Sequence, residues 1–152
     1  MEVEKLEIKN FGDLSLKELY DLLALRTNVF VVEQECAYPE LDYHDQAARH
    51  VLLYRGAHLA AYARISAPGT VYRQLSIGRV AVSFHERGRG LGRQVFTAAV
   101  KEVDRAGPQT LKIQAQTYLI DFYRSFGFRA VTEEYPDYGI MHVDMIREPA
   151  EN

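Results

Sequence analysis

The region most able to do chemistry is a run of seven residues, 87–93, in which arginine and glycine alternate apart from one leucine. Glycine lets backbone N–H groups approach a ligand closely, and the start of a helix presents free N–H groups in a field that favours anions. Arginine side chains add cationic donors to the same turn. This combination predicts that a phosphate-bearing ligand binds at Gly88, Gly90 and Gly92, with Arg87, Arg89 and Arg93 beside them.

The spacing of these glycines excludes two common phosphate-binding motifs. A dinucleotide-binding turn needs G-x-G-x-x-G, but Arg93 stands where the third glycine belongs, and no Gly-Lys-Ser or Gly-Lys-Thr ending of a Walker A loop occurs. The pattern that does fit is Arg87-x-x-Gly90-x-Gly92, directly after an apolar strand. It resembles the coenzyme A pyrophosphate loop of the GNAT superfamily of N-acetyltransferases.

A second motif lies downstream, where the stretch 113–128 changes from alternating strand residues to a short helical pattern. The helix is expected to end at Gly127, a usual residue just beyond a helix C-terminus. This stretch resembles the second GNAT motif, in which a tyrosine precedes a Gly-Phe pair. Tyr123 takes the tyrosine position, Gly127 and Phe128 follow in register, and Gln116 replaces the asparagine often found where this helix begins.

The two ends of the chain narrow the resemblance to the ElaA-like branch of GNAT proteins, recognised as acetyltransferases without a firm acceptor. The similarity lies in Arg26-x-x-Val29-Phe30-Val31-Val32-Glu33-Gln34, in Glu40-Leu41-Asp42, Asp45 and His50, and in Gly139-Ile140-x-His142-x-x-Met145. It covers nearly the whole chain. The resemblance implies an α/β, GNAT acyl-CoA-binding fold with a mixed central β-sheet of about six or seven strands flanked by helices. We expect residues 1–152 to form a single GNAT N-acetyltransferase domain.

The resemblance also implies where acetyl-CoA, the acetyl donor, lies. In this fold the strand before the glycine turn splays from its neighbour, so its unpaired backbone groups can bind the pantetheine amides as an added strand would. An N–H group of this strand can also stabilise the oxyanion formed when an amine attacks the thioester. The cofactor-binding residues implied are Val80, Ala81, Val82, Arg87, Gly88, Arg89, Gly90, Leu91, Gly92, Arg93 and Gln116.

The resemblance implies that Tyr123 assists the leaving coenzyme A thiolate. A phenol with a pKa of about 10 is a weaker acid than a thiol with a pKa of about 8.5, so full proton donation is uphill by about 2 kcal/mol. A hydrogen bond to the developing charge on sulfur, with late proton transfer, is the better supported role. The structural alternative is a core tyrosine that packs beside Phe122 and Phe126.

The sequence shows no equally clear general base. The strand residues before the glycine turn, 77–79, include no carboxylate, which leaves Glu33, His50 and His142 as candidates. Each of them can also have a purely structural role, since a glutamate at a helix end usually faces solvent and histidines are often buried in the core. We take Glu33 as the catalytic candidate beside Tyr123.

Other polar residues have weaker functional interpretations. Asp42 and Asp45 lie in a polar loop and could attract a cationic amine, although such loops are usually solvated. Cys36 as an acyl-transfer nucleophile would need an activating partner, which direct transfer does not require. The five histidines show no close metal-ligand spacing, so no metal is predicted.

Bulk properties exclude several classes of protein. The chain has 152 residues, 47% hydrophobic and 26% charged, which is typical of an ordinary soluble globule. A formal charge of −3 argues against a general nucleic-acid surface. One cysteine makes no intramolecular disulfide, the start is not that of a signal peptide, and no run of about 18 apolar residues occurs. We therefore expect a cytoplasmic monomer or homodimer with no membrane or nucleic-acid partner.

The expected elements follow from apolar spacing and turn residues. A capping box at Ser15 and Glu18 opens the first helix. A polar loop covers 35–48. We expect strands at 6–8, 49–55, 59–66, 77–82 and 110–116, helices from the glycine turn to about Ala106 and at 117–126, and a final hairpin across 137–139.

These inferences lead to an N-acetyltransferase that moves an acetyl group from acetyl-CoA to a primary amine by direct attack through a tetrahedral intermediate. The acceptor is a small-molecule or peptide amine. Transfer of a longer acyl group stays open, as does a module that binds acetyl-CoA without catalysis. The presence of Tyr123 favours an enzyme, whereas the absence of an obvious general base leaves a non-catalytic binding module as the alternative.

Overall fold

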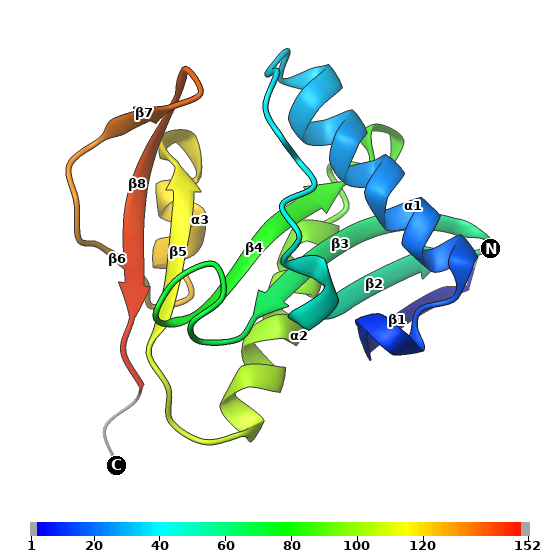
Figure 1. Ribbon diagram of the computed structural model, residues 1–152, viewed down its shortest axis with the longest axis horizontal. Coiled ribbons are helices and arrows are strands. Elements are labelled where there is room, and N and C mark those ends of the chain that lie inside the picture. Colours follow the sequence, from blue (N-terminus) through cyan, green and yellow to red (C-terminus); the bar gives the residue numbers. More distant parts are fainter. Residues whose placement is uncertain (1–2, 150–152) are drawn as a thin grey trace.

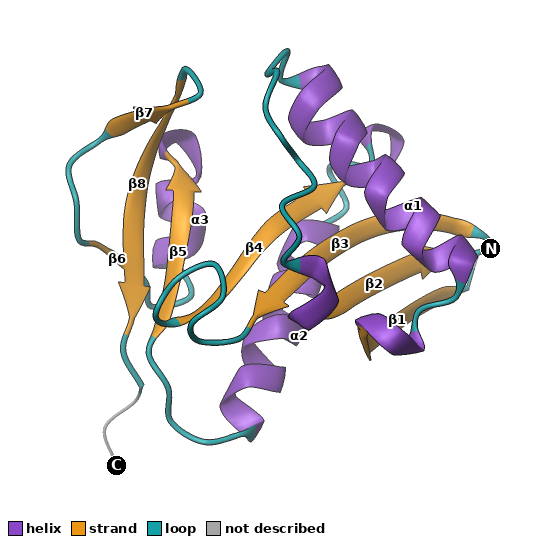
Figure 2. Cartoon of the chain, in the orientation of Figure 1, coloured by secondary structure: helices purple, strands orange, loops and turns teal. Residues whose placement is uncertain are grey.

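A computed structural model describes residues 3–149 of the protein as one mixed β-sheet of eight strands with helices on both faces (Figures 1 and 2). The predicted fold class is confirmed. The strand order is β1-β2-β3-β4-β5-β8-β6, and β7 pairs with β8. The strands are β1 (Glu4–Asn10), β2 (Arg49–Arg55), β3 (His58–Ser66), β4 (Leu75–Val82), β5 (Leu111–Gln116), β6 (Arg129–Ala130), β7 (Tyr135–Asp137) and β8 (Ile140–Arg147).

The sheet opens in its middle, between β4 and β5. Every other neighbouring pair is antiparallel, whereas β4 and β5 run parallel and pair only at Leu75 with Leu111 and Ser76 with Lys112. Beyond these pairs the two strands diverge, as Figure 1 shows. The predicted splay of this strand is confirmed, and backbone groups of β4 from Ile77 onward have no strand partner on the β5 side.

The strand β4 is also bent by a bulge. Its register with β3 shifts between Tyr62 and Arg64, opposite the segment that contains Arg79. Arg79 has a φ of 52°, in the left-handed region that a non-glycine residue rarely adopts. Bulges re-aim side chains and are frequent beside functional sites. The bulge therefore turns the Arg79 side chain at the point where the sheet opens.

Two apolar layers hold the helices against the sheet. Helix α1 (Leu16–Thr27) packs Leu22 and Leu25 on one face, against Leu52 and Tyr62. Helices α2 (Leu91–Arg105) and α3 (Ile120–Arg124) cover the opposite face, where the larger core lies. The residues of α2 in that core are Leu91, Val95, Phe96, Ala99, Val100 and Val103, which follow helical spacing.

The helix ends explain several differences from the expectation. The capping box is confirmed, since the Ser15 side chain accepts from the Glu18 amide and the Glu18 carboxylate accepts from the Ser15 amide. The helix does not stop after α1 but continues as a π-helical turn, Asn28–Glu33, which the sequence analysis did not predict. The helix expected at 117–126 is shorter, because a 3-10 turn over Thr117–Leu119 precedes the five residues of α3.

The remaining expectations are close to the structure. The hairpin of β2 and β3 and the final hairpin of β7 and β8 are both present, and α2 ends one residue before Ala106. The loop 35–48 contains one 3-10 turn, Asp45–Ala47. Further 3-10 turns cover Phe11–Asp13 and Phe84–Glu86. Between residues 3 and 149, no helix has the length and apolar character needed to cross a membrane.

Candidate active site

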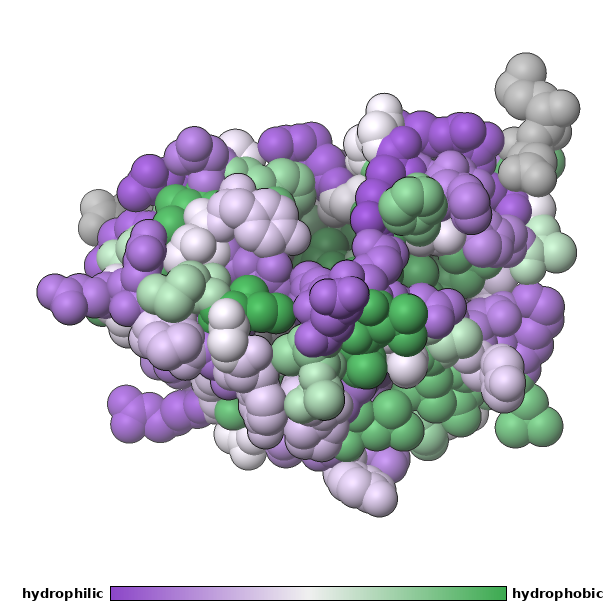
Figure 3. All heavy atoms as spheres, turned by 90° about the horizontal axis from the view of Figure 1, so that it is seen from above, coloured by the Kyte–Doolittle hydropathy of each residue, from purple (hydrophilic) through white to green (hydrophobic). Residues whose placement is uncertain are grey.

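The opening between β4 and β5 contains a cleft with a cavity volume of about 200 Å³. Seen from above, the molecule is hollowed there, with apolar residues at the floor and hydrophilic residues around it (Figure 3). Three of the residues expected at the site, Val80, Gln116 and Tyr123, line it together. The other lining residues used below are Gln34, Cys36, Tyr38, Arg79, Gln114, Tyr118, Asp137, Tyr138, Ile140 and His142.

The glycine turn follows β4 and leads directly into α2. The left-handed φ angles of Gly88 (81°) and Gly90 (75°) explain why glycine stands at both positions. A Cβ atom added to Gly92 would meet the Val82 side chain at 3.4 Å, so here glycine permits close approach of helix and strand. In the described chain, the amides of residues 87–93 donate to no backbone carbonyl. Consecutive free amides at a helix N-terminus suit a pyrophosphate group.

The arginines of this turn have different surroundings. Arg87 donates to the Val82 carbonyl and forms a two-pronged ion pair with Glu33, with Nη1–Oε2 and Nη2–Oε1 distances of 2.8 and 2.9 Å. Arg93 lies over the rings of Phe122 and Phe126 and so joins α2 to α3. Arg89 is half exposed and lies 3.8 Å from Glu86. Exposed Arg87 and Arg89 are therefore the side chains best placed to reach a phosphate.

Tyr123 lies at the apolar wall of the cleft and is 8% exposed. Its ring packs against Phe96, Phe122 and Phe128, so the packing role considered from the sequence is present. Nothing in the described chain hydrogen-bonds its hydroxyl group, which is left available to a ligand. Burial raises the pKa of Tyr123 to about 12, with a smaller contribution from Tyr118. A phenol of this acidity is a hydrogen-bond donor at neutral pH.

The three candidate bases lie in different places. Glu33 is absent from the cleft lining and is bound to Arg87. His50 is fully buried away from the cleft, and its two ring nitrogens contact the Tyr62 hydroxyl at 2.7 Å and the Asp45 carbonyl at 2.9 Å. His142 lines the cleft, opposite Gln116 in the sheet.

The tautomer of His142 follows from its partner. Its Nδ1 lies 2.7 Å from the Ile140 carbonyl oxygen, which can only accept, so Nδ1 donates. In the neutral ring Nε2 then carries the lone pair. Of the three candidates, His142 alone combines a place in the cleft with a nitrogen that can accept a proton.

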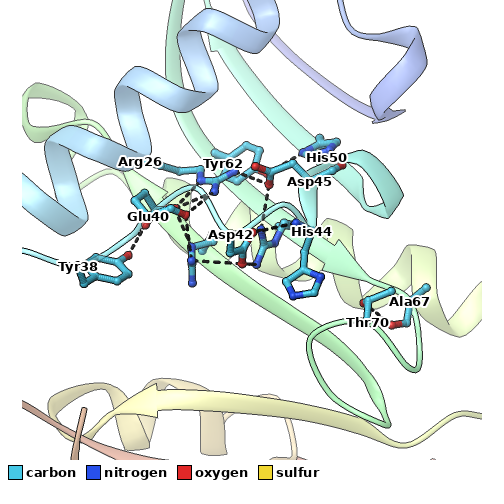
Figure 4. Close-up of polar contacts among 12 residues, drawn as sticks. Arg26, Tyr38, Glu40, Asp42, His44, Asp45, His50, Tyr62, Ala67 and Thr70 are labelled. Atoms are coloured by element: carbon cyan, nitrogen blue, oxygen red, sulfur yellow. Dashed lines mark hydrogen bonds and ion pairs between the residues drawn. The ribbon is translucent and has the colours of Figure 1, made fainter. Parts of the chain in front are cut away.

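A buried ion-pair network fixes the loop 35–48 to the sheet, as Figure 4 shows. Arg26 of α1 binds Asp45 at 2.6 Å and Glu40 at 2.7 Å, and its side chain has no exposed surface. Arg64 of β3 binds Asp45 at 2.9 Å and Asp42 at 2.8 Å. The loop is therefore not a solvated segment. The idea that Asp42 and Asp45 attract a cationic amine is wrong, because arginine partners occupy both carboxylates.

The network also orients two residues of the cleft. Arg79 donates from Nε to Oε2 of Glu40 at 2.7 Å, and the Tyr38 hydroxyl donates to the other oxygen of Glu40. Burial alone would raise the pKa of Asp42, but the hydrogen bond and charge of Arg64 hold it below the ordinary value of 3.8. Asp42 thus stays ionised beside Arg64 at neutral pH, while the hydrogen bonds of Glu40 keep Tyr38 and Arg79 in place.

Several cleft residues were missed by sequence reasoning. Tyr38, Arg79, Gln114, Asp137 and Tyr138 come from four separate segments, and no spacing in the sequence connects them. The one usable signal was the Asp-Tyr-Gly turn, which predicted the hairpin but not its direction. Tyr138 has a φ of 49°, unusual for a bulky residue, and its carbonyl accepts the Cys36 thiol at 3.6 Å.

Two further chemistries find no support in the described residues. No group of three or more His, Cys, Asp or Glu side chains there could hold a metal ion. Cys36 is buried and its thiol contacts a carbonyl rather than an activating base. The cleft therefore offers hydrogen bonds, His142 and four tyrosines for its chemistry, and of these tyrosines Tyr123 has its hydroxyl left available.

Comparisons with known proteins agree with this geometry. Residues 16–149 match the acetyltransferase (GNAT) domain family. The chain is similar to protein ElaA of Escherichia coli, with 41% identity over 140 residues that cover 90% of this chain and 92% of that protein. A UPF0039 protein of Synechocystis is also 41% identical over 140 residues, with 91% of each protein covered.

Solved structures show the same similarity in three dimensions. An acyl-CoA N-acyltransferase from Pseudomonas aeruginosa superimposes with a TM-score of 0.90 at 40% identity, covering 95% of this chain and 99% of that one. Escherichia coli ElaA superimposes with a TM-score of 0.89 at 38% identity, covering 96% and 100%. The chain belongs to the GNAT acyltransferase family. Within that family it is ElaA-like, so the resemblance found in the sequence is confirmed.

Proposed function

We propose that the protein transfers an acetyl group from acetyl-CoA to a primary amine. The observation that carries the proposal is the divergence of β4 from β5 directly beside a turn with free amides. An extended pantetheine arm can pair with the open edge of β4 while the pyrophosphate binds the amides of residues 87–93. The similar Pseudomonas aeruginosa protein is described as an acyl-CoA N-acyltransferase, which supports the same donor class.

In the proposed reaction a neutral amine attacks the thioester carbonyl, the new N–C bond forms, and the C–S bond then breaks. His142 removes a proton from the amine through Nε2, and the Tyr123 hydroxyl donates a hydrogen bond to the departing sulfur. The backbone of β4 near Val80 supports the oxyanion. Glu33 remains a second candidate base, but it is paired with Arg87 and does not line the cleft. His142 lines the cleft and is therefore favoured.

Thermal unfolding with acetyl-CoA, NAD and ATP tests the donor. A ligand that binds only the native state adds about 2.7 kcal/mol at 100 times its dissociation constant. We expect a clear rise in melting temperature with acetyl-CoA and much smaller rises with the other two. Equal shifts for all three ligands, or none with acetyl-CoA, would contradict the assignment.

Release of free thiol from acetyl-CoA, measured against a panel of amines, tests the transfer. The same assay with longer acyl-CoA donors shows whether the enzyme prefers the acetyl group. Binding of acetyl-CoA without thiol release from any amine would favour the alternative, a module that binds the cofactor without catalysis.

A further inference from the structure

Charge is sparse in the cleft, and its distribution is uneven. Of the lining residues, two carry a formal charge, Arg79 and Asp137. Arg79 is already neutralised, because its Nε lies 2.7 Å from Oε2 of Glu40 and its Nη2 lies 3.4 Å from Oδ2 of Asp42. Its Nη2 also donates to the Glu40 carbonyl at 3.1 Å. The guanidinium is thus held by the buried network and is not free to bind an anion.

Asp137 is in the opposite situation. Its Oδ2 accepts a hydrogen bond from Nε2 of Gln114 at 2.8 Å, and no cationic side chain of the described residues lies within ion-pair distance. Asp144, on the adjacent strand β8, differs because Lys112 lies 3.4 Å from it and the Tyr135 hydroxyl donates to it. Asp137 is therefore the one carboxylate of the described cleft lining, and its charge has no counter-ion.

Aromatic rings surround the same part of the cleft. The rings of Tyr38 and Tyr138 lie 5.5 Å apart and meet from the loop 35–48 and the β7–β8 hairpin. Tyr118 lines the cleft from the segment after β5. Ring faces attract ammonium groups, most strongly where water is partly excluded. The Arg79 guanidinium already lies over the Tyr38 ring at 5.8 Å, so the ring of Tyr138, next in sequence to Asp137, is the one that can meet an ammonium held by the Asp137 carboxylate.

From this arrangement we propose that Asp137 holds an ammonium group of an aliphatic diamine acceptor, which rests on the proposed amine acetyltransferase function. An ammonium bound in an ion pair has no lone pair and cannot attack the thioester. Asp137 lies on β7, whereas His142 lies on β8 and Tyr123 on α3. One amino group therefore stays charged at Asp137 while the other loses its proton at His142 and reacts.

The experiment compares 1,4-diaminobutane with butylamine in wild type and Asp137→Asn. The variant removes the charge but keeps an oxygen that can accept from Gln114, so folding should be preserved. Glu134→Gln is the matched control, since it makes the same change of charge at an exposed site outside the cleft. Calorimetric affinity for each amine and for acetyl-CoA is measured beside kcat/KM.

We expect wild type to favour the diamine over butylamine by about tenfold or more in kcat/KM, because butylamine held at Asp137 has no second amino group to react. Asp137→Asn should remove that preference without changing acetyl-CoA affinity, and Glu134→Gln should behave as wild type. An unchanged preference in Asp137→Asn, or no preference in wild type, overturns the role of Asp137. If acetyl-CoA does not bind or no amine is acetylated, the proposed function fails. The calorimetric affinity of the diamine for wild type and for Asp137→Asn then still decides whether Asp137 binds an ammonium.

Discussion

The glycine turn, which follows β4, and the cleft itself are built differently, and we call them the donor end and the acceptor end of the site. At the glycine turn, one contiguous segment, 87–93, offers backbone amides and exposed arginines, and its ion pair with Glu33 is partly open to solvent. At the acceptor end, four segments meet, and buried ion pairs of Arg26 and Arg64 hold one of them, the loop 35–48. The turn is formed by local conformation. The acceptor end exists only when distant parts of the chain are folded together.

This difference has an energetic side. Exposed ion pairs such as Arg87 with Glu33 contribute about 0–1 kcal/mol to stability. Removing one partner of a buried pair costs about 3–5 kcal/mol, because a charge is left uncompensated away from water. Substitutions at the acceptor end should therefore act on folding, and substitutions at the turn should act on binding of the donor.

Arg26→Ala gives the largest expected effect. It removes the buried cation that Glu40 and Asp45 share and leaves each with one arginine, Arg79 or Arg64, so the free energy of unfolding should fall by about 3–5 kcal/mol in urea titrations. Arg124→Ala removes an exposed pair with Asp121 and should change stability by less than about 0.5 kcal/mol. A loss below about 1 kcal/mol in Arg26→Ala would mean that the network does not hold the acceptor end.

Gly90→Val tests the other end. The φ of 75° disfavours a branched residue, although an added Cβ would meet no atom within 4 Å, so the strain is local. We expect acetyl-CoA affinity to fall at least about 100-fold with native circular dichroism retained, from loss of the amides that bind phosphate. Gly12→Val, at a glycine with open space and no left-handed φ, is the control. A folded Gly90→Val with unchanged affinity would place the pyrophosphate elsewhere.

The contrast between the ends also explains what the sequence could predict. The turn was recognisable because its glycines, arginines and flanking elements are consecutive. The position of Tyr123 followed from the resemblance to a motif in which a tyrosine precedes a Gly-Phe pair. The mixed sheet and the splay of β4 came from the family resemblance, whereas the strand order was not predicted. Local patterns and a recognised family were enough for the fold and for the conformation of the glycine turn before α2.

The acceptor end could not be predicted, because its determinants are tertiary. Asp42 and Asp45 look like solvated loop carboxylates until Arg26 and Arg64 are brought over them by α1 and β3. Asp137 belongs to no recognisable sequence motif. It differs from Asp144, which is paired with Lys112, in having no ion-pair partner among the described residues. The π-helical turn that carries Glu33 away from the cleft lining has no sequence signature that we recognise.

Tyr123→Phe tests the role of the Tyr123 hydroxyl group in the cleft. The ring and its packing on Phe96 and Phe128 remain, while the hydrogen bond to the departing sulfur is lost. General acid assistance contributes about 10²–10⁴-fold, and a thiolate leaves readily, so we expect kcat to fall about 100-fold with acetyl-CoA affinity unchanged. Steady-state kinetics and calorimetry measure the two quantities. A kcat within twofold of wild type, with chemistry rate-limiting, would make Tyr123 a packing residue only.

The smallest expected effect is a pH dependence of stability that originates at His50, behind the acceptor end. Burial lowers the pKa of His50 below its ordinary value of 6.5, although the Asp45 carbonyl and charge act in the opposite direction. Arg26 and Arg64 lower it further. Between the folded and the unfolded pKa, the unfolded chain binds more protons, so this stability is present above pH 6.5 and is lost as the pH falls.

The free energy of unfolding should therefore decrease on acidification from pH 7 to pH 5, by at most about 1.4 kcal/mol per pH unit from this group. His50→Gln keeps hydrogen-bonding capacity toward Tyr62 and the Asp45 carbonyl but does not titrate, so its unfolding curves should show a weaker slope over the same range. Acetyl-CoA affinity should depend on pH in the same way in both proteins, because the glycine turn belongs to the donor end of the site and His50 does not. If the free energy of unfolding falls equally with pH in wild type and His50→Gln, the pH dependence comes from groups other than His50.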